Sequence, residues 1–205
     1  VGKALTDQAS PKHQIRRGAV IRVVQGSDDQ WAVRQLPEVE GAFVSMDPRT
    51  GLIRAMVGGF DFERNKFNHV TQAWRQPGSS FKPFIYSAAL EKGFTPATVV
   101  NDAPLFYNAG STGSRAWEPK NYDGKFEGPM TLRRALAKSK NMVSIRVLES
   151  VGTHYAQDWL TNFGFDAAKH LPYLPMALGA GSVTPLQMAD GYAVFANGGY
   201  RVNPT

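Results

Sequence analysis

The sequence predicts an α+β fold, because strand patterns occupy its first third and helical patterns most of the remainder. Two pairs of short apolar runs, each pair separated by turn residues, lie between residues 19 and 57 and have the form of β-hairpins. From residue 79 onward, apolar residues recur at three- and four-residue intervals in several stretches, which is the spacing of amphipathic helices. An antiparallel sheet with helices on its faces accounts for both patterns.

Composition narrows the class of protein. The chain has 205 residues, of which 42% are hydrophobic and 20% charged, and this is ordinary for a globular protein with a buried core. No stretch approaches the ~20 apolar residues of a membrane span, so either the protein is soluble or any anchor lies outside this sequence. The net charge of +6 suits an anionic partner, but no nucleic-acid-binding motif accompanies the dispersed basic residues, and we expect no nucleic acid. The absence of cysteine excludes disulfides, thiolate metal sites and cysteine nucleophiles.

The N-terminal part of the chain is expected to form a separate small element. Residues 1–18 are polar and basic without sustained periodicity, so we interpret them as a linker. The runs 19–24 and 31–36 flank turn residues and predict two paired strands. Because one hairpin is marginally stable by itself, we assign residues 1–40 to a linker with a small β segment and residues 41–205 to the main domain.

A second hairpin is expected at the start of the main domain. Residues 42–46 and 52–57 are the two apolar strands, and residues 47–51 between them carry Asp, Pro and Gly at turn positions. Both strands are apolar enough to be covered on both faces, which indicates a sheet beneath helices.

The breaker pair Pro77-Gly78 precedes a predicted helix that begins near Ser79 and ends at Gly93. Pro83 is compatible with its first turn, where an N–H has no intrahelical partner. The apolar face of this helix is formed by Phe81, Phe84, Ile85, Ala88 and Ala89. This face is expected to be buried, which places Ser79 in the first turn of a core helix.

Ser79 and Lys82 are three residues apart, so their side chains are expected on the same face of the helix. A serine beside an amine has a base within reach, and the positive end of the helix dipole favours developing negative charge. Ser79 is therefore a candidate nucleophile. The alternative is that Ser79 only caps the helix and Lys82 is solvated. A Ser-x-x-Lys pattern alone favours this alternative, because it occurs about once by chance in a chain of this length.

Residues 95–130 contain many prolines and glycines and few periodic signals, which predicts a long irregular segment. Such segments in compact domains are commonly functional. The aromatic side chains of Tyr107, Trp117 and Tyr122 either line a groove or anchor the segment on the core, and anchoring is the commoner use. We retain Trp117 and Tyr122 as candidate groove residues.

Further helices are expected after residue 130, with Thr131 as the N-cap of the first and glycines at the ends of the later ones. The predicted helices cover residues 131–139, 142–151, 155–163 and 186–197. Residues 200–202 are expected to begin a strand.

The triplet Ser139-Lys140-Asn141 interrupts the apolar periodicity between the first two of these helices. A hydroxyl and a carboxamide two residues apart on a turn can face one cleft. The alternative is an ordinary turn in which Ser139 or Asn141 caps a helix, and this is favoured for the triplet alone. Together with the upstream Ser-x-x-Lys, the triplet matches the first two of three motifs of penicillin-recognising serine enzymes.

Longer blocks of sequence resemble the class A, bifunctional penicillin-binding proteins of the 1A type. The blocks are residues 75–84, 117–124, 131–141, 177–181, 184–187 and 197–199. The resemblance extends from about residue 41 to residue 205, and the basic β segment before it is similar to the region that precedes the transpeptidase domain in the 1A type. It implies the transpeptidase fold shared with serine β-lactamases, in which an antiparallel sheet carries helices on its faces and a helical subdomain adjoins it.

The resemblance also implies a peptidoglycan D,D-transpeptidase. Ser79 would attack the D-Ala-D-Ala carbonyl of a stem peptide, its backbone N–H would stabilise the oxyanion, and an amine of a neighbouring strand would resolve the acyl-enzyme. Lys82 would act as the base, with a pKa lowered by burial. Ser139 would relay a proton, and Asn141 would hold Lys82 and donate its amide to the substrate. β-Lactams would acylate the same serine.

No metal or organic cofactor is expected. The four histidines show no ligand spacing, and each is expected at the surface or in a loop: His13, His69, His154 and His170. The expected partners are stem peptides ending in D-Ala-D-Ala and β-lactams, with other cell-wall synthesis proteins as further candidates. The resemblance implies the periplasmic side of the bacterial inner membrane, with membrane contact only through an anchor outside this sequence.

The family's third motif, a strand carrying Lys-Thr-Gly or Lys-Ser-Gly, does not occur after Ser139. Arg49-Thr50-Gly51 is rejected as a substitute because it precedes the nucleophile and occupies a predicted turn. We expect the third motif, a glycosyltransferase domain and the anchor outside residues 1–205, so the chain alone is expected to be inactive.

Two alternative functions remain. A hydrolytic relative, either a D,D-carboxypeptidase or a β-lactamase, shares the first two motifs, although the longer blocks argue against it. A catalytically silent β-lactam sensor would carry the same motifs as well.

Overall fold

The computed structural model describes residues 15, 18–34, 36–37, 39–112 and 115–205. The chain separates into two units, residues 1–40 and residues 41–205. Most of the linker predicted for the first 18 residues lies outside the described part.

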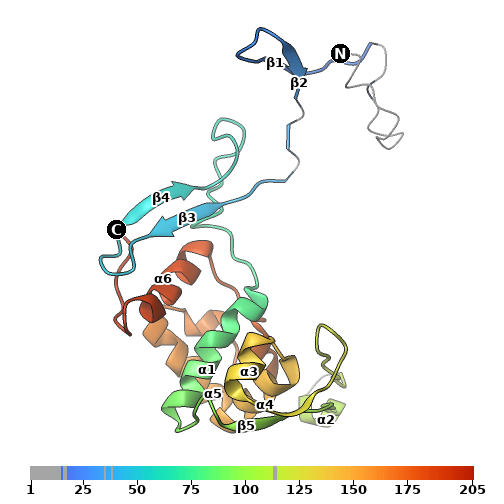
Figure 1. The fold of residues 1–205 in the computed structure, drawn as a ribbon, viewed down its shortest axis with the longest axis vertical. Coiled ribbons are helices and arrows are strands. Elements are labelled where there is room, and N and C mark those ends of the chain that lie inside the picture. Colours follow the sequence, from blue (N-terminus) through green and yellow to red (C-terminus); the bar gives the residue numbers. More distant parts are fainter. Residues whose placement is uncertain (1–14, 16–17, 35, 38, 113–114) are drawn as a thin grey trace. The chain divides into compact units, whose positions relative to one another are not determined.

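The first unit contains the expected hairpin in a shorter form. Strand β1 (Val23–Gln25) pairs antiparallel with β2 (Trp31–Val33) (Figure 1). Their side chains are largely exposed, with Trp31 at 62%. A two-stranded hairpin is only marginally stable by itself. Position 35, within the second predicted run, is not described.

The second unit begins with the other predicted hairpin, formed by β3 (Phe43–Met46) and β4 (Ile53–Val57). Asp47 closes its turn: the carbonyl accepts a hydrogen bond of 2.9 Å from the Gly51 N–H, and the carboxylate accepts one of 2.9 Å from the Arg49 N–H. Arg49 and Thr50 therefore lie in a turn, as expected, and not on a strand.

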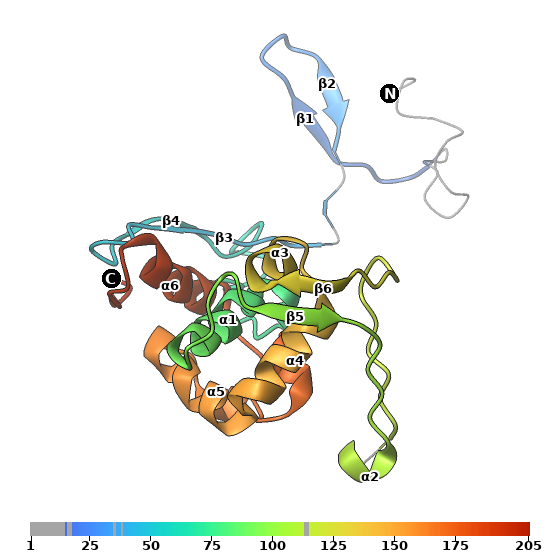
Figure 2. The same cartoon turned by 60° about the horizontal axis from the view of Figure 1, so that its bottom comes forward.

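The expectation that this hairpin is covered on both faces is wrong for the described residues. Helix α6 (Pro185–Ala196) packs against β3 (Figures 1 and 2). Phe43 is nevertheless 57% exposed and Val57 52% exposed. An apolar strand composition indicates that a face can be buried, but it does not say which element covers it.

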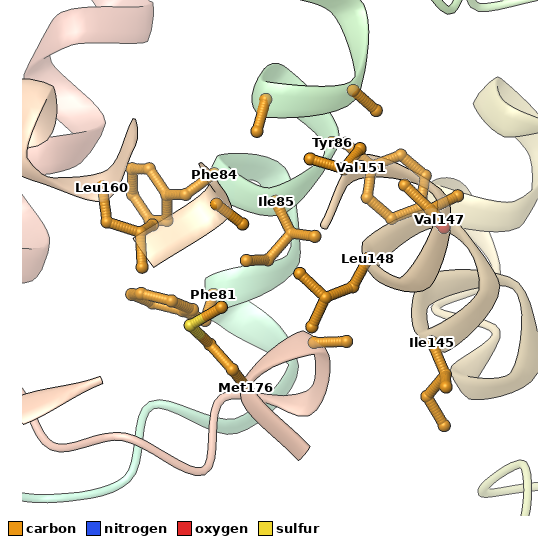
Figure 3. Packing of buried hydrophobic residues seen from close by; sticks show 14 of the residues in the cluster. Phe81, Phe84, Ile85, Tyr86, Ile145, Val147, Leu148, Val151, Leu160 and Met176 are labelled. Carbon is orange, nitrogen blue, oxygen red and sulfur yellow. The ribbon is translucent and has the colours of Figure 1, made fainter. Parts of the chain in front are cut away.

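The hydrophobic core lies among the helices of the second unit. Helix α1 packs against α4 and α5, and Figure 3 shows Ile85 of α1 beside Leu148 of α4 in this interface. The α-helices here are α1 (Lys82–Glu91), α3 (Leu132–Ala137), α4 (Asn141–Val151) and α5 (Thr153–Leu160). The 3-10 helices are η2 (Gly78–Phe81), η3 (Thr161–Phe163), η4 (Ala167–Lys169) and η5 (Leu174–Leu178). These positions confirm the predicted helices to within a few residues at each end.

The prediction of an irregular segment over residues 95–130 is wrong in part. Strand β5 (Val99–Asp102) pairs antiparallel with β6 (Gly128–Thr131), with Asn101 opposite Pro129. Between them the chain makes a long excursion, tied by a bridge between Tyr107 and Trp117 and carrying the short α2 (Ala109–Thr112) (Figure 2). Asn, Asp, Gly and Pro are depleted in strands. Because β5 contains Asn and Asp and β6 contains Gly and Pro, the sequence carries no strand signal for this pair.

The described C-terminal residues differ from the prediction as well. Residues 200–202 form no strand. Instead, the Thr205 N–H donates to the Gly51 carbonyl at 3.0 Å and the Ile53 N–H donates to the Thr205 carbonyl at 2.8 Å, so Thr205 lies beside the start of β4.

The fold is α+β, with antiparallel strand pairs and helices in separate stretches of the chain. The described residues form three two-stranded sheets, of which β1–β2 is the small β segment expected before the main domain. None of the described helices is both long and apolar enough to cross a bilayer.

Candidate active site

Ser79 lies in the tight turn that leads into α1. The turn is the 3-10 helix η2, which continues directly into the α-helix at Lys82. Gly78 adopts a φ of +57°, a conformation that glycine reaches without a steric penalty, and Phe81 is fully buried and anchors the turn. Ser79 is thus exposed at the N-terminal end of a core helix, where the helix dipole favours negative charge.

Three backbone and side-chain contacts hold the serine turn from the opposite side. The Gly78 N–H donates to the Gly179 carbonyl at 3.3 Å, and Gln76 Nε2 donates to the Ala180 carbonyl at 3.2 Å. The Tyr192 hydroxyl donates to the Ser80 carbonyl at 2.7 Å. A Cβ on residue 179 would lie 2.1 Å from the Gly78 oxygen, so a glycine is required there. The 177–181 block noted in the sequence therefore supports the turn that carries Ser79.

Lys82 is buried beneath this turn and is surrounded by neutral acceptors. Its Nζ donates to the Ser139 carbonyl at 2.7 Å, to Ser139 Oγ at 3.0 Å and to Asn141 Oδ1 at 2.7 Å. Burial lowers the pKa of Lys82 to about 8, because a low-dielectric environment disfavours the charged amine. The direction agrees with the sequence-based expectation, and a fraction of the amine is neutral near physiological pH.

Ser139 occupies the turn between α3 and α4 in a left-handed conformation, with φ +53°. This is uncommon for a residue other than glycine, asparagine or aspartate and costs about 1–3 kcal/mol. The conformation brings both oxygens of Ser139 to the Lys82 ammonium. Backbone strain at this position coincides with two hydrogen bonds to the buried lysine.

Asn141 is the first residue of α4. Its Oδ1 accepts from Lys82, and its Nδ2 donates to the Lys120 carbonyl at 2.8 Å. One of the two Nδ2 hydrogens is therefore bonded within the protein. The second hydrogen can be donated to an acceptor oxygen of a substrate.

Ser79, Ser139 and Asn141 line one pocket of about 280 Å³. The structure thus brings Ser79 and the Ser139–Asn141 triplet to the same pocket. Tyr122 also lines the pocket and is fully exposed. Trp117 does not line it: its ring stacks on Tyr107 at 5.6 Å between centroids and packs against the core.

Further residues at the pocket were missed by the sequence reasoning. Asn121, Asp123, Lys138 and Lys140 belong to its lining. Lys140 is only 2% exposed, and its Nζ lies 3.0 Å from Asp123, 3.2 Å from Glu127 and 3.4 Å from Asp102. Lys140 was visible only as the middle residue of the motif, and its carboxylate partners lie in a segment that was predicted to be irregular.

His170 lies in the loop between η4 and η5 but is buried, which the sequence did not indicate. It is 1% exposed and stacks on Phe81 at 4.7 Å with an interplanar angle of 9°. Neither of its ring nitrogens has a hydrogen-bond partner among the described residues, and burial lowers the pKa of His170 to about 4. His13 lies outside the described residues. No group of three or more His, Cys, Asp or Glu side chains that could hold a metal occurs in the described ranges.

The comparisons with known proteins agree with one another. Residues 41–205 match the family model for the penicillin binding protein transpeptidase domain. Over 201 residues the chain is 53% identical to penicillin-binding protein 1A of Neisseria flavescens, covering 98% of this chain and 25% of that protein. It is 48% identical to penicillin-binding protein 1A of Pseudomonas aeruginosa, covering 95% of this chain and 24% of that protein. The chain spans about a quarter of the length of these relatives.

Solved structures show the same similarity. The crystal structure of penicillin-binding protein 1A from Haemophilus influenzae superposes with a TM-score of 0.83 at 43% identity, covering 90% of this chain and 27% of that one. PonA1 from Mycobacterium tuberculosis, solved in complex with penicillin V, superposes with a TM-score of 0.69 at 27% identity, covering 82% of this chain and 47% of that one.

Proposed function

Because the chain belongs to the penicillin-binding protein transpeptidase family, we propose that residues 41–205 carry the nucleophile and one wall of the active site of a peptidoglycan D,D-transpeptidase. The observation that carries the proposal is the buried Lys82 amine, held by Ser139 and Asn141. These two residues line the same pocket as Ser79. If the Ser-x-x-Lys pattern were a chance match, nothing would require its lysine to be buried and bonded to a serine and an asparagine of a second motif.

Acylation begins at Ser79. The neutral Lys82 amine takes the Oγ proton as Oγ attacks the carbonyl of the penultimate D-Ala of a stem peptide. The Ser79 N–H at the helix N-terminus is one oxyanion donor. The peptide bond to the terminal D-Ala breaks, its nitrogen receives a proton, and the acyl group stays on Ser79 as an ester. A pKa near 8 for Lys82 supports this role, because it allows proton transfer in both directions near neutral pH.

Ser139 and Asn141 assist this proton transfer. Ser139 Oγ lies 3.0 Å from Lys82 Nζ and relays the proton toward the leaving amine. Asn141 holds Lys82 through Oδ1, and its second amide hydrogen is directed to the acyl chain of the substrate. An amine of a second stem peptide then attacks the ester, forms the cross-link and releases Ser79.

β-Lactams acylate the same serine, because their strained amide mimics the D-Ala-D-Ala bond. The complex of PonA1 with penicillin V supports β-lactam binding by a protein of the same fold. In the whole protein we place this domain on the periplasmic side of the bacterial inner membrane, with stem peptides and β-lactams as its ligands. The resemblance to class A proteins adds a glycosyltransferase activity elsewhere in the protein.

Labelling with a fluorescent penicillin tests the proposal in the full-length protein. We expect a stable covalent adduct that Ser79→Ala abolishes, because the acylated oxygen is lost. Ser150→Ala is the control, since Ser150 is an exposed serine near the end of α4 that does not line the pocket, and it should be labelled normally. Absence of labelling in the wild-type protein, or labelling that persists in Ser79→Ala, would refute the proposed nucleophile.

A product assay separates the transpeptidase from a hydrolytic relative. Incubation with a pentapeptide donor and an amine acceptor should give a cross-linked dimer. If tetrapeptide alone accumulates, the enzyme is a carboxypeptidase. If labelling occurs and neither product forms, the domain is a sensor.

A further inference from the structure

We propose that Asn121 is a positioning residue of this active site, which fixes Asn141 and, through it, the Lys82 amine. The inference rests on the proposed function, because it assigns a role in Ser79 acylation. Asn121 lies 20 residues before Asn141 in the sequence and is only 4% exposed. Its carboxamide joins the start of α4 to the buried end of β5.

The oxygen of Asn121 caps the helix that carries Asn141. Oδ1 accepts from the Asn141 N–H at 2.8 Å and from the Met142 N–H at 3.3 Å. The first N–H groups of a helix have no partner within it and usually bond to the side chain of the N-cap residue. The N-cap of α4 is Lys140, which makes no such side-chain bond. Asn121 therefore supplies a cap that the local sequence of α4 lacks.

The amide nitrogen of Asn121 fixes the orientation of its carboxamide from the opposite side. Nδ2 donates to Asp102 Oδ1 at 2.7 Å and to the Lys125 carbonyl at 2.8 Å. Both of these partners only accept, and the two helix N–H groups only donate. A rotation that exchanged the oxygen and nitrogen would break every one of these bonds. The carboxamide thus has one permitted orientation.

Asp102 is anchored in turn. It is fully buried, and its Oδ2 accepts from the Glu127 N–H at 3.0 Å and lies 3.4 Å from Lys140 Nζ. A buried carboxylate requires a partner of opposite charge and satisfied lone pairs. Lys140 supplies that charge from the residue between Ser139 and Asn141. The active-site triplet and Asn121 are therefore fastened to the same buried carboxylate.

Asn141 is consequently held on two sides by neighbouring residues. Asn121 holds its backbone N–H, and the Lys120 carbonyl holds its Nδ2 at 2.8 Å. This leaves Oδ1 directed at Lys82 Nζ, at 2.7 Å. A misplacement of about 1 Å in a catalytic group can reduce a rate by about 100-fold, so loss of the cap should appear in the chemistry at Ser79.

Two other roles for Asn121 make different predictions. If it only stabilises the fold, its removal lowers the melting temperature and leaves acylation of the folded protein unchanged. If it binds the substrate directly, since it borders the pocket, its effect on acylation is independent of Asn141. A positioning role makes the two effects dependent on each other.

A double-mutant cycle distinguishes these roles. The measured quantity is the second-order rate constant for acylation of the full-length protein by a fluorescent penicillin, for Asn121→Ala, Asn141→Ala and the double variant. We expect Asn121→Ala to be about 10- to 100-fold slower than wild type. In the Asn141→Ala background the same change should cost less than about threefold. If the two losses multiply, or if folded Asn121→Ala reacts at the wild-type rate, the positioning role is wrong.

Two further variants complete the design. Asn101→Ala is the matched control, because Asn101 is an exposed asparagine next to Asp102 on β5, and it should react as wild type. Asn121→Ser is neutral, so it places no second carboxylate beside Asp102, but its side chain is too short to bond both the start of α4 and Asp102. Its rate should therefore fall below that of wild type, and it replaces the alanine variant in the cycle if that variant does not fold. Lack of acylation in the wild-type protein would instead refute the proposed function.

Discussion

Among the described residues, Lys82 and Lys140 are both buried, and their pKa values are shifted in opposite directions. Lys82 is bonded to a carbonyl, a hydroxyl and a carboxamide, and burial lowers its pKa to about 8. Burial also acts on Lys140, but hydrogen bonds to Asp123 and Glu127 outweigh it and raise the pKa of Lys140. One amine is therefore suited to exchange a proton, and the other remains a permanent cation that holds the structure around it.

The pH dependence of acylation should report on Lys82. If its neutral amine is the base, the acylation rate constant rises with pH and levels off above a midpoint near 8, because the reactive form lacks the proton. The measurement is fluorescent-penicillin acylation of the full-length protein between about pH 6 and pH 9.5.

Two variants make this test specific. Lys82→Met should abolish acylation, because the base is removed. Lys140→Met should slow acylation but keep the midpoint, because Lys140 acts on the geometry and not on the proton. A rate independent of pH over this range would contradict the assignment of Lys82 as the base.

At the scale of elements, the serine turn rests on a buried aromatic layer that includes His170. The imidazole stacks on Phe81 of η2 and makes an edge contact with Phe165 at 5.7 Å between centroids. A Cβ on residue 181 would lie 2.1 Å from its Nδ1, so the ring fills the space beside a glycine. With no hydrogen-bond partner in the described part of the chain, the ring acts as an aromatic packing residue.

His170 should make the domain less stable in acid. Burial lowers its folded-state pKa from 6.5 to about 4, so between these values the unfolded chain binds a proton that the folded chain does not. The free energy of unfolding is therefore unaffected by protonation of His170 above about pH 6.5, and it falls by about 3 kcal/mol as the pH is lowered toward 4.

His170→Phe keeps the stacking and removes the titration. The difference in unfolding free energy between wild type and His170→Phe, measured at pH 7 and pH 4.5, should therefore change in favour of the variant in acid. An equal loss of stability in both proteins would show that His170 does not titrate on unfolding.

The sequence predicted the helices well but did not predict the pairing of β5 with β6. The difference is that helices follow from local spacing, whereas strand pairing depends on distant residues. The apolar face of α1 is set by local spacing, and every residue of that face is buried. Strands β5 and β6 pair Asn101 with Pro129, and such residues carry no strand signal because the partner strand decides their conformation. Motif spacing likewise singled out Ser79, Lys82, Ser139 and Asn141 as candidates, whereas Asn121 was only one residue of the 117–124 block and had no role assigned to it. Its cap on α4 forms only when the 117–124 segment folds against the start of that helix, and no local sequence pattern indicates this contact.

On the scale of the whole domain, the two halves of the site belong to two helices of one core. Lys82 begins α1 and Asn141 begins α4, and the two helices pack against each other. Ile85 and Leu148 are both fully buried and lie side by side in this interface (Figure 3). The distance from Lys82 to Asn141 is thus set by hydrophobic packing one to two turns away from the polar site.

Leu148→Ala tests this dependence. The cavity should lower stability by about 2–5 kcal/mol, and the altered spacing of α1 and α4 should slow acylation of the molecules that remain folded. Leu90→Ala is the control, because Leu90 lies on α1 but is 47% exposed, so it should change neither property by much. The two measurements are thermal unfolding and the penicillin acylation rate per folded molecule. If Leu148→Ala is destabilised and yet its folded fraction reacts at the wild-type rate, the core supports the fold without setting the geometry of the site.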